Sequence, residues 1–149
     1  GLIGARAEEI VFTGCGSESD NLANKGTIWS LCRQNPGKAH VITSTVEHPA
    51  VLHCCAFLER MDGEVTYLQV DSQGMITPDQ VEAAINERTV LVSLMLANNE
   101  TGVIFPIEEI SRVTGKHGIR LHTDAVQAVG KIPVDVSRLD VDLLSLSAH

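Results

Sequence analysis

The sequence lacks long hydrophobic runs and an excess of basic residues. Its wholly apolar stretches are only a few residues long, far below the roughly 20 that span a bilayer. Lys and Arg number 11 against 19 Asp and Glu, a formal net charge of −8. With no basic patch, the composition argues against a nucleic-acid-binding protein. The first nine residues lack a basic stretch followed by an apolar one, so we expect no signal peptide.

Cysteine is sparse and is not arranged as in a disulfide scaffold or a redox motif. The four cysteines are Cys15, Cys32, Cys54 and Cys55, and none of them forms a Cys-x-x-Cys pair. This usage favours a reducing compartment, and we expect the cytoplasm.

What is present is an ordinary globular composition. The chain has 149 residues, of which 44% are hydrophobic and 20% are charged. A chain of this length buries roughly 70% of its unfolded surface, which is enough for a core. We find no repeat, linker or internal boundary, so residues 1–149 are interpreted as a single segment. Because the chain closes directly after a predicted strand, we expect this segment to be an incomplete domain.

Segments of strand and helix periodicity alternate along the chain. The run at 90–96 is almost continuously apolar, as in a central parallel strand covered on both faces. The alternation predicts an α/β fold with a doubly wound, mainly parallel sheet. Strands are predicted at 9–13, 40–43, 64–70, 90–96, 119–123 and 141–146. Helices are predicted at 17–33, from Pro49 onward, at 78–85 and at 107–117. The first helix is expected to bury Leu22, Ile28, Leu31 and Cys32, and to stop at a turn over 34–37.

Ligands of open α/β sheets gather at the carboxyl ends of the strands, and the first candidate there is a glycine turn. Gly14, Gly16 and Ser17 follow the first predicted strand and open a helix. Free N–H groups at such an N-terminus bind anions, and Ser17 could cap the helix or donate to a phosphate. A plain turn is the alternative, because neither a GxGxxG nor a Gly-Lys-Ser/Thr pattern is present.

The second candidate is His48, at the start of the helix that begins at Pro49. The helix dipole favours a neutral imidazole there, which could stack on a planar ligand or move a proton. A polar helix cap is the alternative. A zinc site formed by His48, His53, Cys54 and Cys55 is disfavoured, because His53 and Cys54 point to different helix faces from His48 and no second ligand pair has zinc-site spacing.

Three later strand ends also carry polar groups. Asn98, Asn99 and Glu100 follow the buried strand; as an alternative role, the amides could satisfy local backbone groups. Asp124 ends the next strand, where partial burial demands a partner or a capping role, and Gln127 follows it.

Ser147 and His149 end the last strand and alternate, so both could face one side. As a nucleophile and base they are poor candidates, since Ser147 lacks a Gly-x-Ser-x-Gly elbow. Taken together, the strand ends supply a phosphate cup, a stacking ring, amides, a carboxylate and a hydroxyl. A pyridoxal phosphate site requires this set, in which the carboxylate keeps the pyridine nitrogen protonated.

Five ordered motifs resemble the large domain of cysteine desulfurases, fold-type I pyridoxal phosphate enzymes that supply sulfur for iron–sulfur clusters. The nitrogen-fixation sulfur-donor type is the most similar, and the resemblance runs from about Glu8 to His149. The motifs are Phe12-Thr13 with Ser17 to Asn21, Glu47-His48, Ala97 to Gly102, His122 to Gln127, and Ser145 to His149.

The resemblance implies roles for eight residues. Gly16 and Ser17 would bind the cofactor phosphate, with Ser147 and His149 completing the phosphate cup and its surroundings. His48 would stack on the ring and take part in proton transfer. Asn99 and Gln127 would contact the phenolic oxygen, and Asp124 would pair with the ring nitrogen. No metal is implied.

The resemblance also implies a reaction and what this chain lacks for it. The family converts L-cysteine to L-alanine and leaves the sulfur as a persulfide on an enzyme cysteine, for delivery to an iron–sulfur scaffold or other acceptor. The Schiff-base lysine would directly follow His149, and the nucleophilic cysteine and the substrate-binding arginine lie further on. We therefore expect the isolated chain to be inactive and the full-length enzyme to be a homodimer.

We also consider three alternative functions. A selenocysteine lyase, or another lyase or transaminase, shares this fold. A non-catalytic truncated fragment is a reading from a different class. A Rossmann dehydrogenase is disfavoured, because this sequence lacks the GxGxxG pattern of that fold.

Overall fold

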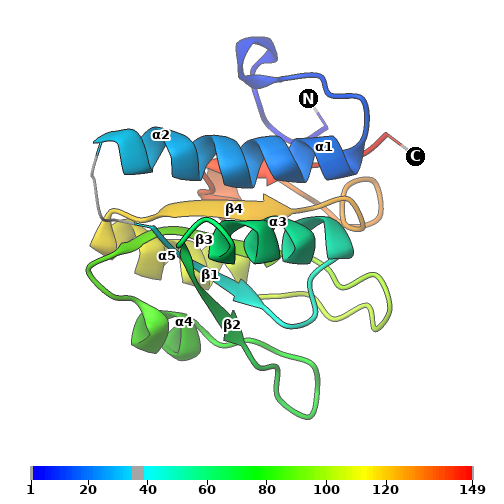
Figure 1. The fold of residues 1–149 in the computed structure, drawn as a ribbon. Coiled ribbons are helices and arrows are strands. Elements are labelled where there is room, and N and C mark those ends of the chain that lie inside the picture. The colour runs from blue at the N-terminus through cyan, green and yellow to red at the C-terminus, as the bar shows by residue number, and fades with distance from the viewer. Residues whose placement is uncertain (1, 35–38, 149) are drawn as a thin grey trace.

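A five-stranded parallel sheet forms the centre of the molecule. The computed structural model describes residues 2–34 and 39–148. The sheet order is β2-β1-β3-β4-β5, with every pair parallel (Figure 1). The strands are β1 (His40–Ser44), β2 (Glu64–Leu68), β3 (Thr89–Met95), β4 (Arg120–Asp124) and β5 (Leu143–Ser145). The predicted α/β class with a parallel sheet is confirmed.

Helices cover both faces of this sheet (Figure 1). A continuous helix runs over α1 (Gly16–Asn21), a π-helical segment η2 (Leu22–Gly26) and α2 (Thr27–Gln34), and it lies on the same face as α3 (Pro49–Glu59). The other face carries α4 (Pro78–Ala84), α5 (Ile107–His117) and the short α6 (Val136–Leu139). The connection from β1 to β2 runs over one face through α3, whereas the connections from β2 to β3 and from β3 to β4 run over the other face through α4 and α5. Doubly wound sheets have this arrangement.

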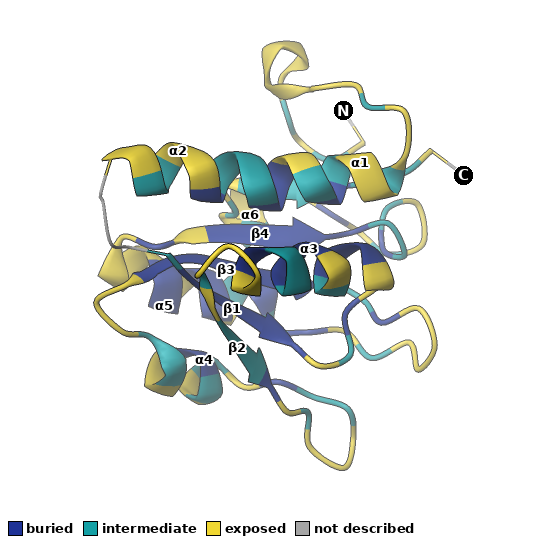
Figure 2. Ribbon diagram, in the orientation of Figure 1, coloured by how far each residue is buried: buried dark blue, intermediate teal, exposed yellow. Residues whose placement is uncertain are grey.

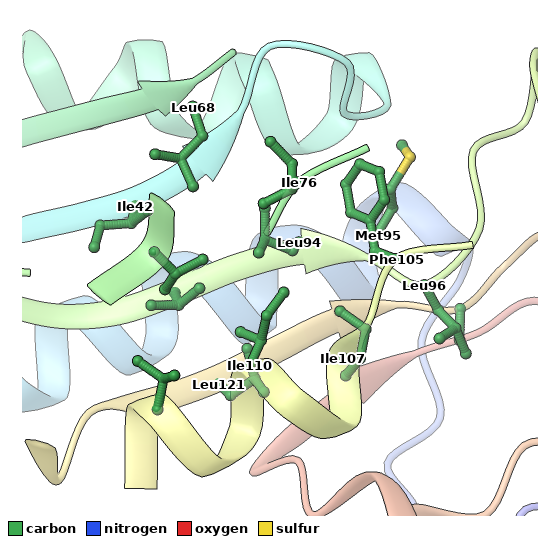
Figure 3. Packing of buried hydrophobic residues seen from close by; sticks show 14 of the residues in the cluster. Ile42, Leu68, Ile76, Leu94, Met95, Leu96, Phe105, Ile107, Ile110 and Leu121 are labelled. Carbon is green, nitrogen blue, oxygen red and sulfur yellow. The ribbon is translucent and has the colours of Figure 1, made fainter. Parts of the chain in front are cut away.

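Alternating side chains of the strands build two apolar layers. Val41 on β1 packs with Val51 and Leu58 of α3, whereas its neighbour Ile42 belongs to the cluster under α4 and α5. Figure 3 shows this second cluster, which includes Ile110 of α5. Every residue of β3 is buried, as predicted for a central strand (Figure 2).

Local signals fix several helix ends where the sequence places them. Thr77 caps α4 and forms a capping box with Gln80, and Pro78 occupies the first turn, where its missing N–H costs nothing. Helix α5 spans the predicted residues and ends at Gly118, whose φ of 65° is left-handed and suits glycine.

The strand predicted at 9–13 is wrong. Residues 7–9 form a 3₁₀ turn, η1 (Ala7–Glu9), and residues 10–13 belong to no strand. Val11 and Phe12 are 71% and 94% exposed. A β-branched, aromatic composition favours a strand, but a strand also needs a neighbour to share its backbone hydrogen bonds.

The helix predicted at 17–33 is present, but it contains a π-helical segment and its predicted apolar face is only partly buried. Ile28 is buried, and Leu31 and Cys32 are half-buried. Leu22, expected on its buried face, is 53% exposed, because the π-helical turn changes which side chains face the sheet. Helix α6 was not predicted, since four residues are too few to show a period. The predicted turn over 34–37 falls largely outside the described residues. None of the described helices is long and apolar enough to cross a membrane.

Candidate cofactor site

A cavity of about 330 Å³ opens at the carboxyl ends of the strands, beside the N-terminus of α1. Seven of the eight predicted site residues line it; the eighth, His149, lies outside the described residues. Five separate segments contribute to its wall, which is formed by Cys15, Gly16, Ser17, Asp20, His48, Met95, Ala97, Asn99, Asp124, Val126, Gln127 and Ser147.

The first turn of α1 forms one side of the cavity. Cys15 is the N-cap and its side chain makes no capping hydrogen bond. Ser17 is therefore not the cap that the sequence suggested, and its hydroxyl remains available to a ligand. A Cβ at Gly16 would lie 3.4 Å from Val126 Cγ2, in close van der Waals contact with another residue of the wall. Free N–H groups and small side chains give this side the character of an anion site.

His48 stands at the N-terminus of α3 and is exposed toward the cavity. The Ala50 N–H donates to His48 Nδ1 over 3.2 Å. Because Nδ1 accepts this hydrogen bond, the ring carries its proton on Nε2 when neutral. The imidazole is thus both a helix cap and a cavity wall, so the two sequence interpretations are compatible.

The two asparagines after β3 have different positions. Asn98 is buried, and its Oδ1 accepts hydrogen bonds from the backbone N–H groups of Glu100 and Thr101 at 2.9 and 2.8 Å. It therefore has the local backbone role that the sequence allowed as an alternative. Asn99 is exposed and lines the cavity, so its amide is the one that can reach a ligand.

Asp124 ends β4 and is 7% exposed. The Val126 N–H donates to its Oδ1 over 2.9 Å, so Asp124 also caps the turn that follows. Burial raises the pKa of Asp124, whereas the Val126 hydrogen bond and nearby His48 oppose the rise. Gln127 lies in that turn and accepts a hydrogen bond from Lys131 Nζ.

Two buried carboxyl groups near the cavity belong to the motifs named above but were assigned no role from the sequence. Asp20 lines the wall and is 2% exposed, and Glu47 is 4% exposed beside it. Burial raises the pKa of Glu47 to about 8, although the Ser44 hydroxyl donates to its Oε1 over 2.6 Å. Helical spacing was the available signal for Asp20, because it follows Gly16 by four residues.

The described residues contain no cluster of three His, Cys, Asp or Glu side chains able to hold a metal ion. Their polar set suits an organic phosphate better. The start of α1 and Ser147 supply hydroxyl and helix N–H groups, the start of α3 supplies an imidazole, and the residues at and after the ends of β3 and β4 supply a buried carboxylate and amides. These groups match the phosphate, the ring face, the ring nitrogen and the phenolic oxygen of pyridoxal phosphate.

Comparison with known proteins defines the class. The family model "Aminotransferase class-V" matches residues 1–149, and the chain belongs to this family of pyridoxal phosphate-dependent enzymes. Within it, the chain is similar to cysteine desulfurases. It is 52% identical over 147 residues to cysteine desulfurase IscS of Methanosarcina thermophila and, equally, to that of Dictyoglomus turgidum. These matches cover 99% of this chain and 36% of each relative.

Solved structures agree. SspA in complex with cysteine superimposes with a TM-score of 0.93 at 44% identity, over 99% of this chain and 42% of that one. A NifS-like protein gives a TM-score of 0.92 at 39% identity, over 99% and 40% of the two chains. The resemblance to cysteine desulfurases and the fold-type assignment are confirmed. The chain spans little more than a third of the length of its curated relatives.

Proposed function

We propose that this chain is the pyridoxal phosphate-binding segment of a cysteine desulfurase, which converts L-cysteine to L-alanine and retains the sulfur as an enzyme persulfide. The observation that carries the proposal is the single cavity lined by seven residues from five separate motifs. A structural neighbour that holds cysteine supports L-cysteine as the substrate.

Different cavity residues bind different groups of the cofactor. Gly16 and Ser17 bind the phosphate through the helix N-terminus, and the Ser147 hydroxyl completes the cup with His149. Asn99 and Gln127 donate to the phenolic oxygen. When bound, pyridoxal phosphate supplies the electron sink of the reaction.

Two residues act on the charges of the ring and on its protons. Asp124 accepts a hydrogen bond from Val126 at Oδ1, and Oδ2 is left to pair with the protonated ring nitrogen. His48 covers the ring face, and its Nε2 exchanges protons, because Nδ1 is engaged by Ala50 N–H. His48 is thus the catalytic residue of this segment.

The oligomeric state, the compartment and the sulfur acceptor are proposed from the family. We propose a homodimer in the cytoplasm that delivers sulfur to an iron–sulfur scaffold or another acceptor. Selenocysteine is the alternative substrate, because it differs from cysteine only in its chalcogen atom and would present the same amino and carboxylate groups to the cavity.

Cofactor binding is tested by titrating the chain with pyridoxal phosphate and following visible circular dichroism. We expect a saturable induced signal that Asp124→Ala abolishes, because the ring nitrogen loses its counter-charge. The exposed Asp79→Ala, on α4, is the matched control and is expected to bind as the wild type does. A signal that survives Asp124→Ala would contradict the assignment of Asp124.

The reaction is tested in a chimera. The matching 147-residue region of the Methanosarcina thermophila relative is replaced by this chain. We expect the chimera to form alanine from L-cysteine. Alanine formed from selenocysteine alone would favour the alternative substrate. A folded chimera that binds the cofactor but forms no alanine from either would contradict the proposal.

A further inference from the structure

A buried polar cluster lies under the cavity, and Asp20 connects it to the cavity wall. We define the cluster as Asp20, Asn24, Ser93, His122 and Ser145, all of which are at most 2% exposed. Asp20 is the member that lines the cavity. Its Oδ1 is buried and has no hydrogen-bond partner among the described residues.

Hydrogen-bond geometry shows that His122, beside Asp20, is uncharged. Asn24 Nδ2 donates to the main-chain oxygen of Asp20 over 2.9 Å, which fixes that atom as the amide nitrogen. The same Nδ2 lies 3.3 Å from His122 Nδ1, so Nδ1 must accept and carries no proton. Ser93 Oγ lies 2.8 Å from this nitrogen and also donates to it. Complete burial agrees, because it lowers the pKa of His122 to about 4.

Asp20 therefore has no counter-charge within the cluster. Its Oδ1 lies 3.8 Å from His122 Nε2, but that ring is neutral and Nε2 lies closer to Ser145 Oγ, at 2.9 Å. A buried carboxylate without a cation is strongly disfavoured.

Among the described residues, no ionisable group on a neighbouring element offsets this penalty at Asp20, and one of them, Asp124, increases it. Asp124 on β4 is the charge that acts on Asp20. Glu47 before α3 and Cys54 on α3 also interact with Asp20, but burial raises the pKa of both, and neither supplies a positive charge to it. Lys25, on η2, has its ammonium over the Phe57 ring at 4.6 Å. His48 acts on Asp124. Burial and the Asp124 charge raise the pKa of Asp20 to about 7, although a hydrogen bond from Ser145 opposes the rise.

We propose that Asp20 keeps its carboxylic acid proton after Asp124 has lost its own, and that it acts as a positioning residue that leaves Asp124 to supply the carboxylate charge facing the cavity. Two carboxyl groups that share a buried site do not both ionise readily. The charge falls on Asp124 because it receives the Val126 N–H. Asp20 Oδ1 receives no donor, and the Ser145 hydroxyl near Asp20 is shared with His122 and Ser19. This inference rests on the proposed function, since one carboxylate then faces one protonated ring nitrogen.

The test is a pH titration of the aspartate side-chain carboxyl carbons by ¹³C NMR, on the ligand-free chain. Asp20→Asn and Asp124→Asn assign the two signals by their loss. We expect Asp20 to titrate near pH 7 and Asp124 at lower pH. An Asp20 midpoint near 4 would overturn the proposal.

The two variants should act asymmetrically. Asp124→Asn removes the repulsion on Asp20 and should lower its midpoint by about one pH unit or more. Asp20→Asn should leave the midpoint of Asp124 unchanged, because Asp20 is already neutral where Asp124 titrates. A fall of the Asp124 midpoint in Asp20→Asn would mean that Asp20 is ionised there, and would overturn the proposal. If a variant fails to fold, through-bond correlation of each carboxyl carbon with its own backbone assigns the two wild-type signals, and their midpoints decide the question.

A second titration in saturating pyridoxal phosphate links this charge to the cofactor. We expect the Asp124 midpoint to fall, because the ring cation stabilises its carboxylate, whereas the Asp20 midpoint stays at or above its ligand-free value. A fall at Asp20 instead would mean that Asp20 pairs with the ring, which would overturn its role. If the cofactor changes neither signal, the proposed function fails, and the ligand-free midpoints still decide the charge of Asp20.

Discussion

At the scale of single residues, buried polar side chains distinguish this molecule from a plain α/β scaffold. His122 is fully buried yet lies within 2.9 Å of the hydroxyls of both Ser93 and Ser145. A buried polar group with partners on neighbouring strands stabilises one arrangement of those strands, and it is costly to leave unpaired. The cluster thus ties β3, β4 and β5 together below the cavity.

Replacing His122 tests this contribution and its pH dependence. We expect His122→Gln to lower the free energy of unfolding at pH 7 by about 2–4 kcal/mol, because hydrogen bonds and packing are lost in the core. The folded pKa of about 4 lies below the ordinary 6.5, so the unfolded chain takes up a proton first. The advantage of His122 is therefore complete above pH 6.5 and falls toward pH 4, by up to about 3 kcal/mol.

Urea unfolding at pH 7 and pH 4.5 measures both effects. The difference between wild type and His122→Gln should shrink at pH 4.5. His53→Gln, at an exposed position on α3, is the matched control and should change little. An equal loss at both pH values would contradict the neutral, buried state of His122.

At the scale of secondary-structure elements, end signals were predictable from the sequence and mid-helix register was not. Pro78 marks the start of α4, and Gly118 marks the end of α5. The π-helical turn of η2 could not be predicted from the sequence. It adds one residue to a single turn, and five residues are too few to show a change in the apolar period. The structure shows this turn, and it places Asn24 on the helix face that contacts His122 of β4.

The capping box of α4 allows a quantitative test at this scale. Gln80 N–H donates to Thr77 Oγ1, and Thr77 N–H donates to Gln80 Oε1 over 2.8 Å. We expect Thr77→Ala to lower the free energy of unfolding by about 1 kcal/mol, because Gln80 N–H loses its acceptor. Thr77→Ser retains the hydroxyl and should remain within about 0.3 kcal/mol of the wild type, on the same principle. Equal losses in the two variants would contradict a capping role.

At the scale of the whole molecule, the described chain exposes apolar surface. Leu2, Val11 and Phe12 are 77%, 71% and 94% exposed. The outer strands β2 and β5 each pair with one neighbour only in the described sheet. Exposed apolar side chains and open strand edges both favour association.

Self-association of the isolated chain follows from this surface. We expect sedimentation velocity to show a rising average mass between about 10 and 200 µM, and Val11→Ser/Phe12→Ser to reduce it, because each change removes exposed apolar area. Trp29→Ser, at another exposed apolar position on α2, is the control for nonspecific hydrophobicity. A wild-type chain that stays monomeric over this range would contradict the prediction.

The sequence by itself determined the alternating elements, the parallel sheet and the motifs that end its strands, because apolar periods, Pro, Gly and capping residues act within a few positions. It also provided the family resemblance. Only the tertiary structure decided that residues 9–13 form no strand, since pairing depends on a neighbour and not on composition. Folding also decided that Asn99, not Asn98, faces the cavity, and that Asp20 lies buried beside Asp124 and a neutral His122. Burial and charge environment are properties of side chains brought together from distant positions, so no local pattern contains them.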